Sequence, residues 1–360
     1  MLTDGFFNPP LFSIEAPFTF TLLRQPSNVH VLFVKDFRTL MTAINRLALF
    51  LIVLTSYAMA MAQTWPDKPV KLVVPYPAGG GVDPVARLVG QKLSERWKVP
   101  VIIDNKAGAS GSIGASYVAH SPPDGLTIMM SATAEVAINQ FIMLKMTYNP
   151  ETDLKPVTLA VRLPFVLVTK PSQAYSTAAE LVAYAKKNPD KITYASSGPG
   201  TPQHLAALLL EQLAGIKMVH VPYKGVAPAM SDLLAGHVDI GFVGLPTGLP
   251  NVQSGALKAL GVSSKTVSPA AQKIAPLADT PALAGFELNQ WFGIFVPGAT
   301  PDVLVQQMQK DIADVLKIPD VKTALEKQGA QPSGMPTAEF EVFLKSEREK
   351  FSRIVKGGNF

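Results

Sequence analysis

Apolar runs and helical patterns alternate along the chain from residue 70 onward. KLVV (71–74) is typical of a buried strand, and VPVIIDN (99–105) and LTIMMSA (126–132) are predicted to be the next two strands. Behind the first strand, apolar residues recur at helical spacing at Val85, Leu88, Val89, Leu93 and Trp97. A strand–helix order of this kind predicts a largely parallel sheet with helices on both faces.

A second set of strands and helices begins at FVLVTK (165–170). Its other predicted strands are KITYASSG (191–198), MVHVPY (218–223), VDIGFVG (238–244) and LKALGVSS (257–264). Helices are predicted at 176–190, around Leu205 and Leu209, and through Met230 to Gly236. The chain then returns through NQWFGIFVP (289–297), and helices that begin near Pro301, Asp320 and Thr337 follow.

We therefore expect an α/β fold with two lobes, each a mostly parallel sheet flanked by helices. Residues 63–164 plus 289–360 would form lobe 1, and residues 165–288 would form lobe 2. This is the plan of a hinged binding protein, in which the ligand lies in the crevice at the carboxyl ends of the strands.

Residues 41–62 have the features of a cleavable signal peptide. Arg46 precedes the apolar segment 47–54, and small-x-small cleavage sites follow at 58–60 and 60–62. The apolar segment is shorter than the roughly 20 residues that span a membrane, although an uncleaved anchor stays an alternative. We expect a periplasmic protein. Residues 1–40 show no clear periodicity, so we interpret them as a non-native extension and expect translation to start at Met41.

Composition excludes several classes of protein. Charged residues make up 16% and apolar residues 48% of the chain, and the net charge of +5 is spread out, which argues against disorder and nucleic-acid binding. The mildly basic surface fits anionic ligands and equally fits ordinary solubility. There is no cysteine, which excludes disulfides, thiolate nucleophiles and a lipid anchor on cysteine.

The stretch VPYPAGGGVDP (74–84) resembles a loop that holds an anion. Its glycines free the backbone, and Asp83 and Pro84 are expected to be the N-cap and first residue of a helix whose amides favour an anion. The Lys-Ser/Thr of a phosphate loop and the last glycine of a dinucleotide fingerprint are missing. A tight turn without a ligand is the alternative. We expect Asp83 to accept from its own helix amides or from a donor on the ligand.

The stretch YASSGPGTPQH (194–204) repeats this arrangement, with Thr201 as the expected cap and Pro202 as the first helical residue. Ser196 and Ser197 add hydroxyl donors. Two such helix starts, one in each lobe, would clamp a small anion from both sides. The loop 105–112 and the residues Ser131 and Thr133 are expected at the same edge of the first sheet. Tyr223 and Lys224 could add an aromatic wall and a cation, although an exposed lysine is an equal alternative for Lys224.

Features that would indicate catalysis or a metal site are missing. GASGS lacks the last glycine of a nucleophile elbow. The histidines have neither the H-x-x-x-H nor the H-E-x-x-H spacing. For His204, at the start of the helix that follows the Ser/Gly turn, we expect ligand binding or packing rather than acid–base chemistry. We expect neither an enzyme nor a metal.

Several stretches stand in the order seen in one family: YPAGGGVDPVAR, DNKAGASGSIGA, PPDGLTIMM, YASSGPGTPQHLA, VPYKGVAPAMSDLLAGHVDIGF and WFGIFVPGATP. With them the chain resembles the Bug-type extracytoplasmic solute receptors of tripartite tricarboxylate transporters. The resemblance extends from Trp65 to the C-terminal helices. It implies a periplasmic Venus-flytrap fold (type II-like), no cofactor, and membrane permease subunits as partners. It also implies a small carboxylate ligand, an organic acid or an acidic amino acid. We expect a monomer that binds no nucleic acid.

The resemblance also implies ligand-binding residues, with one ligand carboxylate held by main-chain amides, partly through water. In lobe 1 these are Tyr76, Ala78, Gly79, Gly80, Asp83, Ala109, Ser110 and Ser131. In lobe 2 they are Ser196, Ser197, Gly198, Thr201 and His204, and more loosely Tyr223 and Asp239. Val82 replaces a small polar residue of relatives, so one hydroxyl contact is not expected. Two other functions stay open: a sensor partner that presents its ligand to a signalling kinase, and a periplasmic enzyme on the same scaffold.

Overall fold

The computed structural model describes residues 20–21, 33–34, 41, 48 and 65–358. The chain divides into two compact units, Met1–Thr64 and Trp65–Phe360. In the first unit, β1 (Phe20–Thr21) and β2 (Phe33–Val34) pair antiparallel. The predicted extension (1–40) and signal peptide (41–62) lie almost wholly outside the described residues.

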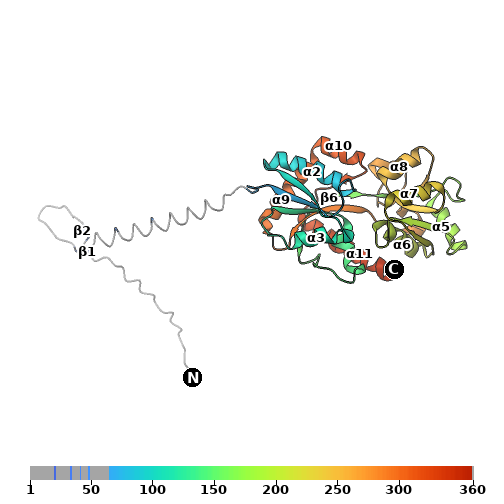
Figure 1. The fold of residues 1–360 in the computed structure, drawn as a ribbon, viewed down its shortest axis with the longest axis horizontal. Helices are drawn as coiled ribbons and strands as arrows, with labels where there is room; N and C mark the ends of the chain where they lie inside the picture. The colour runs from blue at the N-terminus through green and yellow to red at the C-terminus, as the bar shows by residue number, and fades with distance from the viewer. Residues whose placement is uncertain (1–19, 22–32, 35–40, 42–47, 49–64, 359–360) are drawn as a thin grey trace, which may run out of the picture. The chain divides into compact units, whose positions relative to one another are not determined.

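One half of the second unit is a six-stranded sheet of order β13-β6-β12-β5-β3-β4, with helices packed on it. The strands are β3 (Val70–Val74), β4 (Val101–Asn105), β5 (Thr127–Ser131), β6 (Leu154–Leu163), β12 (Gln290–Pro297) and β13 (Gln331–Pro332). The helices are α2 (Val82–Trp97), α3 (Ser112–Ala119), α4 (Asn139–Ile142), α9 (Asp302–Lys317), α10 (Pro319–Lys327) and α11 (Thr337–Gly357). Figure 1 shows α2, α3, α9, α10 and α11 around this sheet.

A five-stranded sheet of order β11-β7-β10-β8-β9 forms the other half of the second unit (Figure 1). Its strands are β7 (Phe165–Thr169), β8 (Thr193–Ser196), β9 (Val219–Pro222), β10 (Ile240–Gly244) and β11 (Lys258–Val262). Its helices are α5 (Ala178–Lys187), α6 (Pro202–Ala214), α7 (Val226–Ala235) and α8 (Leu245–Gln253). Among the described helices of the chain, none is long and apolar enough to cross a membrane.

The predicted α/β class is confirmed, but strand pairing is mixed rather than mostly parallel. β3 pairs parallel with β4 and β5, whereas β12 pairs antiparallel with β5 and β6. In the other sheet β8 pairs parallel with β9 and β10, whereas β7 is antiparallel to β10 and β11. The reason is connectivity: β12 returns from the second sheet and β7 leaves the first, so each runs against its neighbours.

Two long elements were not predicted from the sequence. β6 contains Lys155, Pro156 and Arg162, which interrupt its apolar pattern, yet it pairs with β12 along its length. α8 has the sequence LPTGLPNVQ, with Pro250 inside the helix. Proline and glycine at this density are typical of loops, so packing of α8 against β7 and β10 overrides the local preference.

The core of the second unit lies on both faces of the six-stranded sheet. Leu72 and Val74 of β3 are buried in the same cluster as α2 and α9 residues, whereas Val73 is buried in the cluster that contains α3 and α11 residues. This alternation follows from the two-residue period of a strand. The cluster around Val73 continues into the second sheet, where it includes Leu205 of α6 and Phe242 of β10. The two sheets are therefore joined by a shared apolar core.

Gly293 of β12 tests how tightly this shared core is packed. A Cβ added there would lie 2.5 Å from Cζ of the buried Phe340 and 2.9 Å from Cε2 of Phe295. We expect Gly293→Ala to lower the free energy of unfolding by about 1–3 kcal/mol, because rigid rings must move. Urea unfolding measures it, with Gly81→Ala as control, since Gly81 has helical φ and no atom within 4 Å of an added Cβ. Equal unfolding midpoints for the two variants would contradict the prediction.

Candidate functional site

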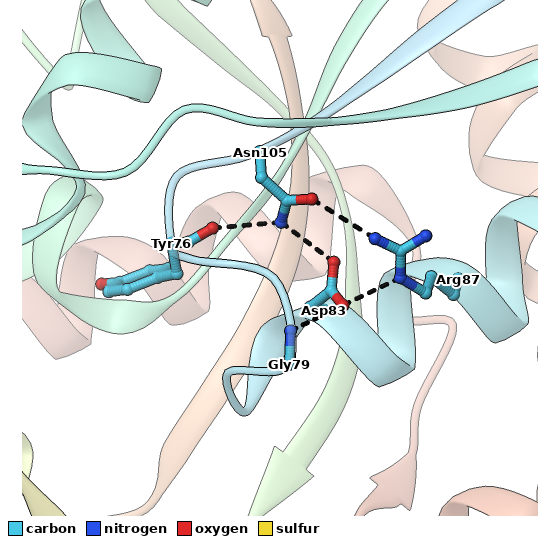
Figure 2. A network of polar contacts seen from close by, with 5 residues as sticks. All are labelled: Tyr76, Gly79, Asp83, Arg87 and Asn105. Atoms are coloured by element: carbon cyan, nitrogen blue, oxygen red, sulfur yellow. Dashed lines mark hydrogen bonds and ion pairs between the residues drawn. The ribbon is translucent and has the colours of Figure 1, made fainter.

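The loop between β3 and α2 is organised by the carboxylate of Asp83. This carboxylate accepts from the Gly79 amide (3.0 Å), from Asn105 Nδ2 (2.9 Å) and from Arg87 Nε (2.8 Å). Asn105 Nδ2 also donates to the carbonyl oxygen of Tyr76 (3.1 Å), so β4 is tied to the same loop. Figure 2 shows these contacts converging on Asp83 while the Tyr76 ring points away from them.

The prediction that Asp83 and Pro84 are the N-cap and first residue of α2 is wrong. The helix begins at Val82 with Gly81 as N-cap, and the Asp83 amide already donates to the Gly80 carbonyl. The Asp83 carboxylate turns back to the loop instead of capping helix amides. Since the Gly79 amide donates to Asp83 and the Gly80 amide donates to the Pro77 carbonyl (3.1 Å), both predicted donors have partners within the loop.

Asp83 is ionised at all but very low pH. Its side chain is only 4% exposed, and Arg87 beside it, with the Gly79 amide and Asn105, lowers its pKa to about 2 against the opposing effect of burial. Hydrogen bonds to the charged form favour that form. The negative charge of Asp83 thus stabilises the loop, and the positive charge of Arg87 balances it.

Replacing Asp83 should weaken the fold in a pH-dependent way. Asp83→Ala leaves the Gly79 amide and Asn105 without their acceptor, and we expect a loss of about 1–3 kcal/mol of unfolding free energy at pH 7. Because the folded-state pKa lies below the ordinary value, the ionised carboxylate stabilises the fold above about pH 4, and this is lost as pH falls towards 2. The melting temperatures of wild type and Asp83→Ala should therefore become equal as the pH is lowered. A constant difference in melting temperature would show that the charge of Asp83 contributes nothing.

The loop after β4 has a strained backbone. Ala109 and Ser110 have φ of 47° and 50°, between Gly108 at 131° and Gly111 at 85°. Positive φ is uncommon for residues other than glycine and collects at functional sites. Asn139 of α4 fixes this turn, because its Nδ2 donates to the Ser110 carbonyl (2.9 Å). Ala109 and Ser110 are exposed, as ligand-binding residues of an open site would be.

Glu135 connects these lobe 1 elements and was missed by the sequence analysis. It lies in the π-helical turn η2 (Ala134–Ile138) after β5, where its carboxyl group accepts from Tyr76 Oη (2.8 Å) and from the Ala132 amide (2.7 Å). Ser131, a predicted site residue, is buried beside it and donates to the Ala132 carbonyl (2.7 Å). A lone carboxyl in the otherwise uncharged stretch SATAEVAINQF is the signal that could have found it.

The second glycine-rich loop joins β8 to α6 and is held by hydroxyls. Thr201 is the N-cap and Pro202 the first residue of α6, as predicted, but Thr201 Oγ1 donates to the Gly198 carbonyl (2.7 Å) rather than capping the helix. The Gly198 amide donates to Ser196 Oγ (3.1 Å), and Ser197 Oγ donates to Gln203 Oε1 (3.1 Å). Ser196 and Ser197 line a cavity of about 20 Å³, enough for a water molecule.

His204 lies in an aromatic stack behind this loop. Its ring is 4.0 Å from that of His220 at an angle of 7°, and Tyr194 stacks on His220 at 4.8 Å. The Gly200 amide donates to His204 Nδ1 (3.0 Å), and Ser196 Oγ lies 2.6 Å from His220 Nε2. Burial, with a smaller contribution from His220, lowers the pKa of His204 to about 4. His204 therefore supports the loop as a neutral acceptor.

The state of His204 can be measured directly. Because its folded-state pKa lies below the ordinary histidine value, the ring should stay neutral at pH 5.5. The unfolded chain binds a proton there, so this residue makes stability fall as pH drops from about 6.5 to 4. Ring nitrogen shifts in ¹⁵N NMR report the protonation state. A His204 ring that titrates near 6.5 would contradict the packing.

Tyr223 and Asp239 lie at opposite ends of the second sheet. Tyr223 follows β9 beside the second loop, where its amide donates to the Ser196 carbonyl (3.0 Å), and its Oη donates to Asp232 of α7 (2.6 Å), which turns the hydroxyl towards that helix. Asp239 stands before β10, at the amino end of the strands, where it accepts from Thr193 N (2.8 Å) and Gln173 Nε2 (2.6 Å). Ser196 ends β8 at the opposite edge of this sheet. Asp239 thus ties the start of β10 to Thr193 and Gln173, at the end of the sheet away from the second loop.

The structure brings the second loop to the first lobe. A Cβ added at Gly200 would lie 2.4 Å from Cδ1 of Ile142, which belongs to α4 of the other sheet. Asn139, in the same short helix, holds Ser110. The lobe 2 loop and the 108–111 turn therefore flank the same helix. Tyr76 of the first loop belongs to the same region, because its hydroxyl contacts Glu135. The Glu135 carboxyl group in turn packs against the 108–111 turn, since an added Cβ at Gly111 would lie 2.9 Å from its carboxyl carbon.

Comparison with known proteins identifies the family. The family model described as "Tripartite tricarboxylate transporter family receptor" matches residues 85–360. The chain belongs to this family. Protein BugT of Bordetella pertussis is 30% identical over 300 residues, which are 83% of this chain and 92% of BugT. The identification as a Bug-type solute receptor is confirmed.

Two solved structures of high similarity carry small carboxylates. An R. palustris protein with adipate has a TM-score of 0.71 and is 32% identical, and the match covers 81% of this chain and 98% of the R. palustris chain. MatC from Rhodopseudomonas palustris with bound malate has a TM-score of 0.68 and 27% identity, over 81% of this chain and 100% of its own. The family and the fold are therefore those of periplasmic solute-binding receptors.

Proposed function

We propose that the protein captures a small carboxylate between its two lobes in the periplasm and delivers it to a tripartite tricarboxylate-type permease. Lobe 1 would be residues 63–164 plus 289–360, and lobe 2 residues 165–288. The observation that carries the proposal is the pair of matching units, β3–loop–α2 and β8–loop–α6. Each loop follows the carboxyl end of a parallel strand, the place where ligands of such sheets bind.

The proposed ligand site consists of loop backbone and hydroxyl groups. Its residues are Tyr76, Ala78, Gly79, Gly80, Ala109, Ser110, Ser131, Ser196, Ser197, Gly198 and Thr201, and more loosely Tyr223; the Gly79 and Gly80 amides, which donate within the loop, shape it rather than hold the ligand. Asp83 and His204 support the loops from behind. A hydrogen bond to a charged group contributes about 1.5–3 kcal/mol net, so a handful of them, less the cost of closure, would be enough for micromolar binding, at roughly −8 kcal/mol.

The chemistry of the ligand follows from the solved relatives and from the loops. Adipate and malate, bound to the two R. palustris proteins, are both dicarboxylates. Two loops from different lobes suit a ligand with an anionic group and a second polar end. Export by a cleaved signal peptide at 41–62 and action as a monomer belong to the same proposal. Presentation of the ligand to a signalling kinase is the alternative, which the neighbouring genes would distinguish.

Loop substitutions test the site. We expect Gly79→Ala combined with Ser197→Ala to weaken carboxylate binding at least tenfold, because Gly79 has φ of 78° and Ser197 loses its hydroxyl. Gly255→Ala is a matched control: Gly255 has φ of 77°, and, like Gly79, no atom within 4 Å of an added Cβ, but it is exposed at the end of α8. Thermal-shift screening of carboxylates, followed by calorimetry, measures binding. Unchanged affinity in the double variant would place the site elsewhere.

A further inference from the structure

Glu135 is a buried carboxyl group inside the proposed site. Its side chain is 0% exposed, and it contacts two of the loops that we assign to the ligand. Tyr76 Oη of the first loop lies 2.8 Å from Oε2, and the 108–111 turn packs so closely that a Cβ at Gly111 would lie 2.9 Å from the carboxyl group. Two of the loops of the proposed site therefore contact Glu135 directly.

The groups that face Glu135 provide hydrogen bonds but no counter-charge. Tyr76 and the Ala132 amide contact the carboxyl oxygens, Ser131 lies beside it, and Tyr148 Oη donates to the Glu135 carbonyl (2.5 Å). Arg348 of α11 approaches from another side, but its Nε donates to the Val136 carbonyl (3.0 Å). Among the described residues, no Lys, Arg or His nitrogen lies within 4.0 Å of the carboxyl oxygens. A buried carboxylate without a cation favours its neutral form.

We propose that Glu135 is a proton-binding site coupled to the ligand, so that a receptor whose Glu135 is ionised takes up one proton with each carboxylate it binds. The proposal rests on the proposed function and specifies its regulation. A ligand anion raises the cost of a second negative charge in the same buried region, so Glu135 is protonated in the complex. A protonated Glu135 donates a hydrogen bond to Tyr76 Oη and keeps its proton, and the Tyr76 hydroxyl is then available to donate a hydrogen bond to the ligand carboxylate.

Linkage gives the direction of the pH effect. Burial raises the pKa of Glu135 to about 7 without ligand, against the lowering effect of its hydrogen bonds, and a bound anion raises the pKa further. Below pH 7 the proton is already present and affinity is constant. Above pH 7 the free protein must take up the proton, so affinity falls, by about tenfold between pH 6 and pH 8.

The test is calorimetry with adipate and malate as probes at pH 6, 7 and 8, in buffers of different ionisation enthalpy. Wild type should lose about tenfold in affinity across this range and take up about one proton per ligand at pH 8. Glu135→Gln mimics the protonated acid, since its amide accepts from Ala132 and donates to Tyr76. It should bind with nearly constant affinity, and comparison with it removes the probes' own titration.

A matched control is Glu211→Gln in α6, which removes a half-buried carboxyl whose pKa is also raised by burial, away from both loops. It should keep the wild-type pH profile. Equal pH profiles in wild type and Glu135→Gln, or no proton uptake by wild type, would overturn the proposal while leaving carboxylate binding intact. If Glu135→Gln fails to fold, the proposal is tested by the number of protons that wild type takes up per ligand at pH 8. Absence of binding by both proteins at every pH, and for every carboxylate screened, would overturn the proposed function as well.

Discussion

The need of each loop amide for an acceptor governs the architecture around the proposed site. A strand that ends in a glycine-rich turn exposes backbone N–H groups, and a buried donor without a partner is costly. In lobe 1 the carboxylate of Asp83 meets that need, because it joins Gly79, Asn105 and Arg87 in one cluster (Figure 2). This single acceptor ties the loop to the first turns of α2 and to the end of β4.

The second lobe solves the same problem without charge. Ser196 and Thr201 bond to Gly198, and His204 accepts from the Gly200 amide as a neutral ring. Asp83 and Glu135, the carboxyl groups that contact Gly79 and Tyr76 of the first loop, both belong to lobe 1. One of them is neutralised by Arg87, which contacts it directly. The other has no such partner among the described residues, so protonation is the remaining way to remove its charge.

Two connections between the sheets determine how the loops meet. β6 and β7 are separated by Pro164 alone, and β12 returns to pair with both β5 and β6. The shared core around Trp291 is reinforced by Glu347 of α11, whose Oε2 accepts from the indole nitrogen (2.9 Å). A chain that crosses at neighbouring strands places the carboxyl ends of both sheets towards each other. This is the geometry that closure around a ligand requires.

The sequence alone determined the α/β class, most strands and helices, and the two glycine-rich turns, because these depend on local periodicity and on glycine, proline and capping chemistry. The family resemblance rested on the same short stretches. Only tertiary structure decided that Asp83 faces the loop rather than its own helix, that Asp239 lies at the far edge of its sheet, and that Glu135 is buried against Tyr76. These depend on contacts between residues far apart in sequence: Glu135 and Tyr76 are 59 positions apart. No local pattern encodes such a contact, because it exists only once the strands have paired.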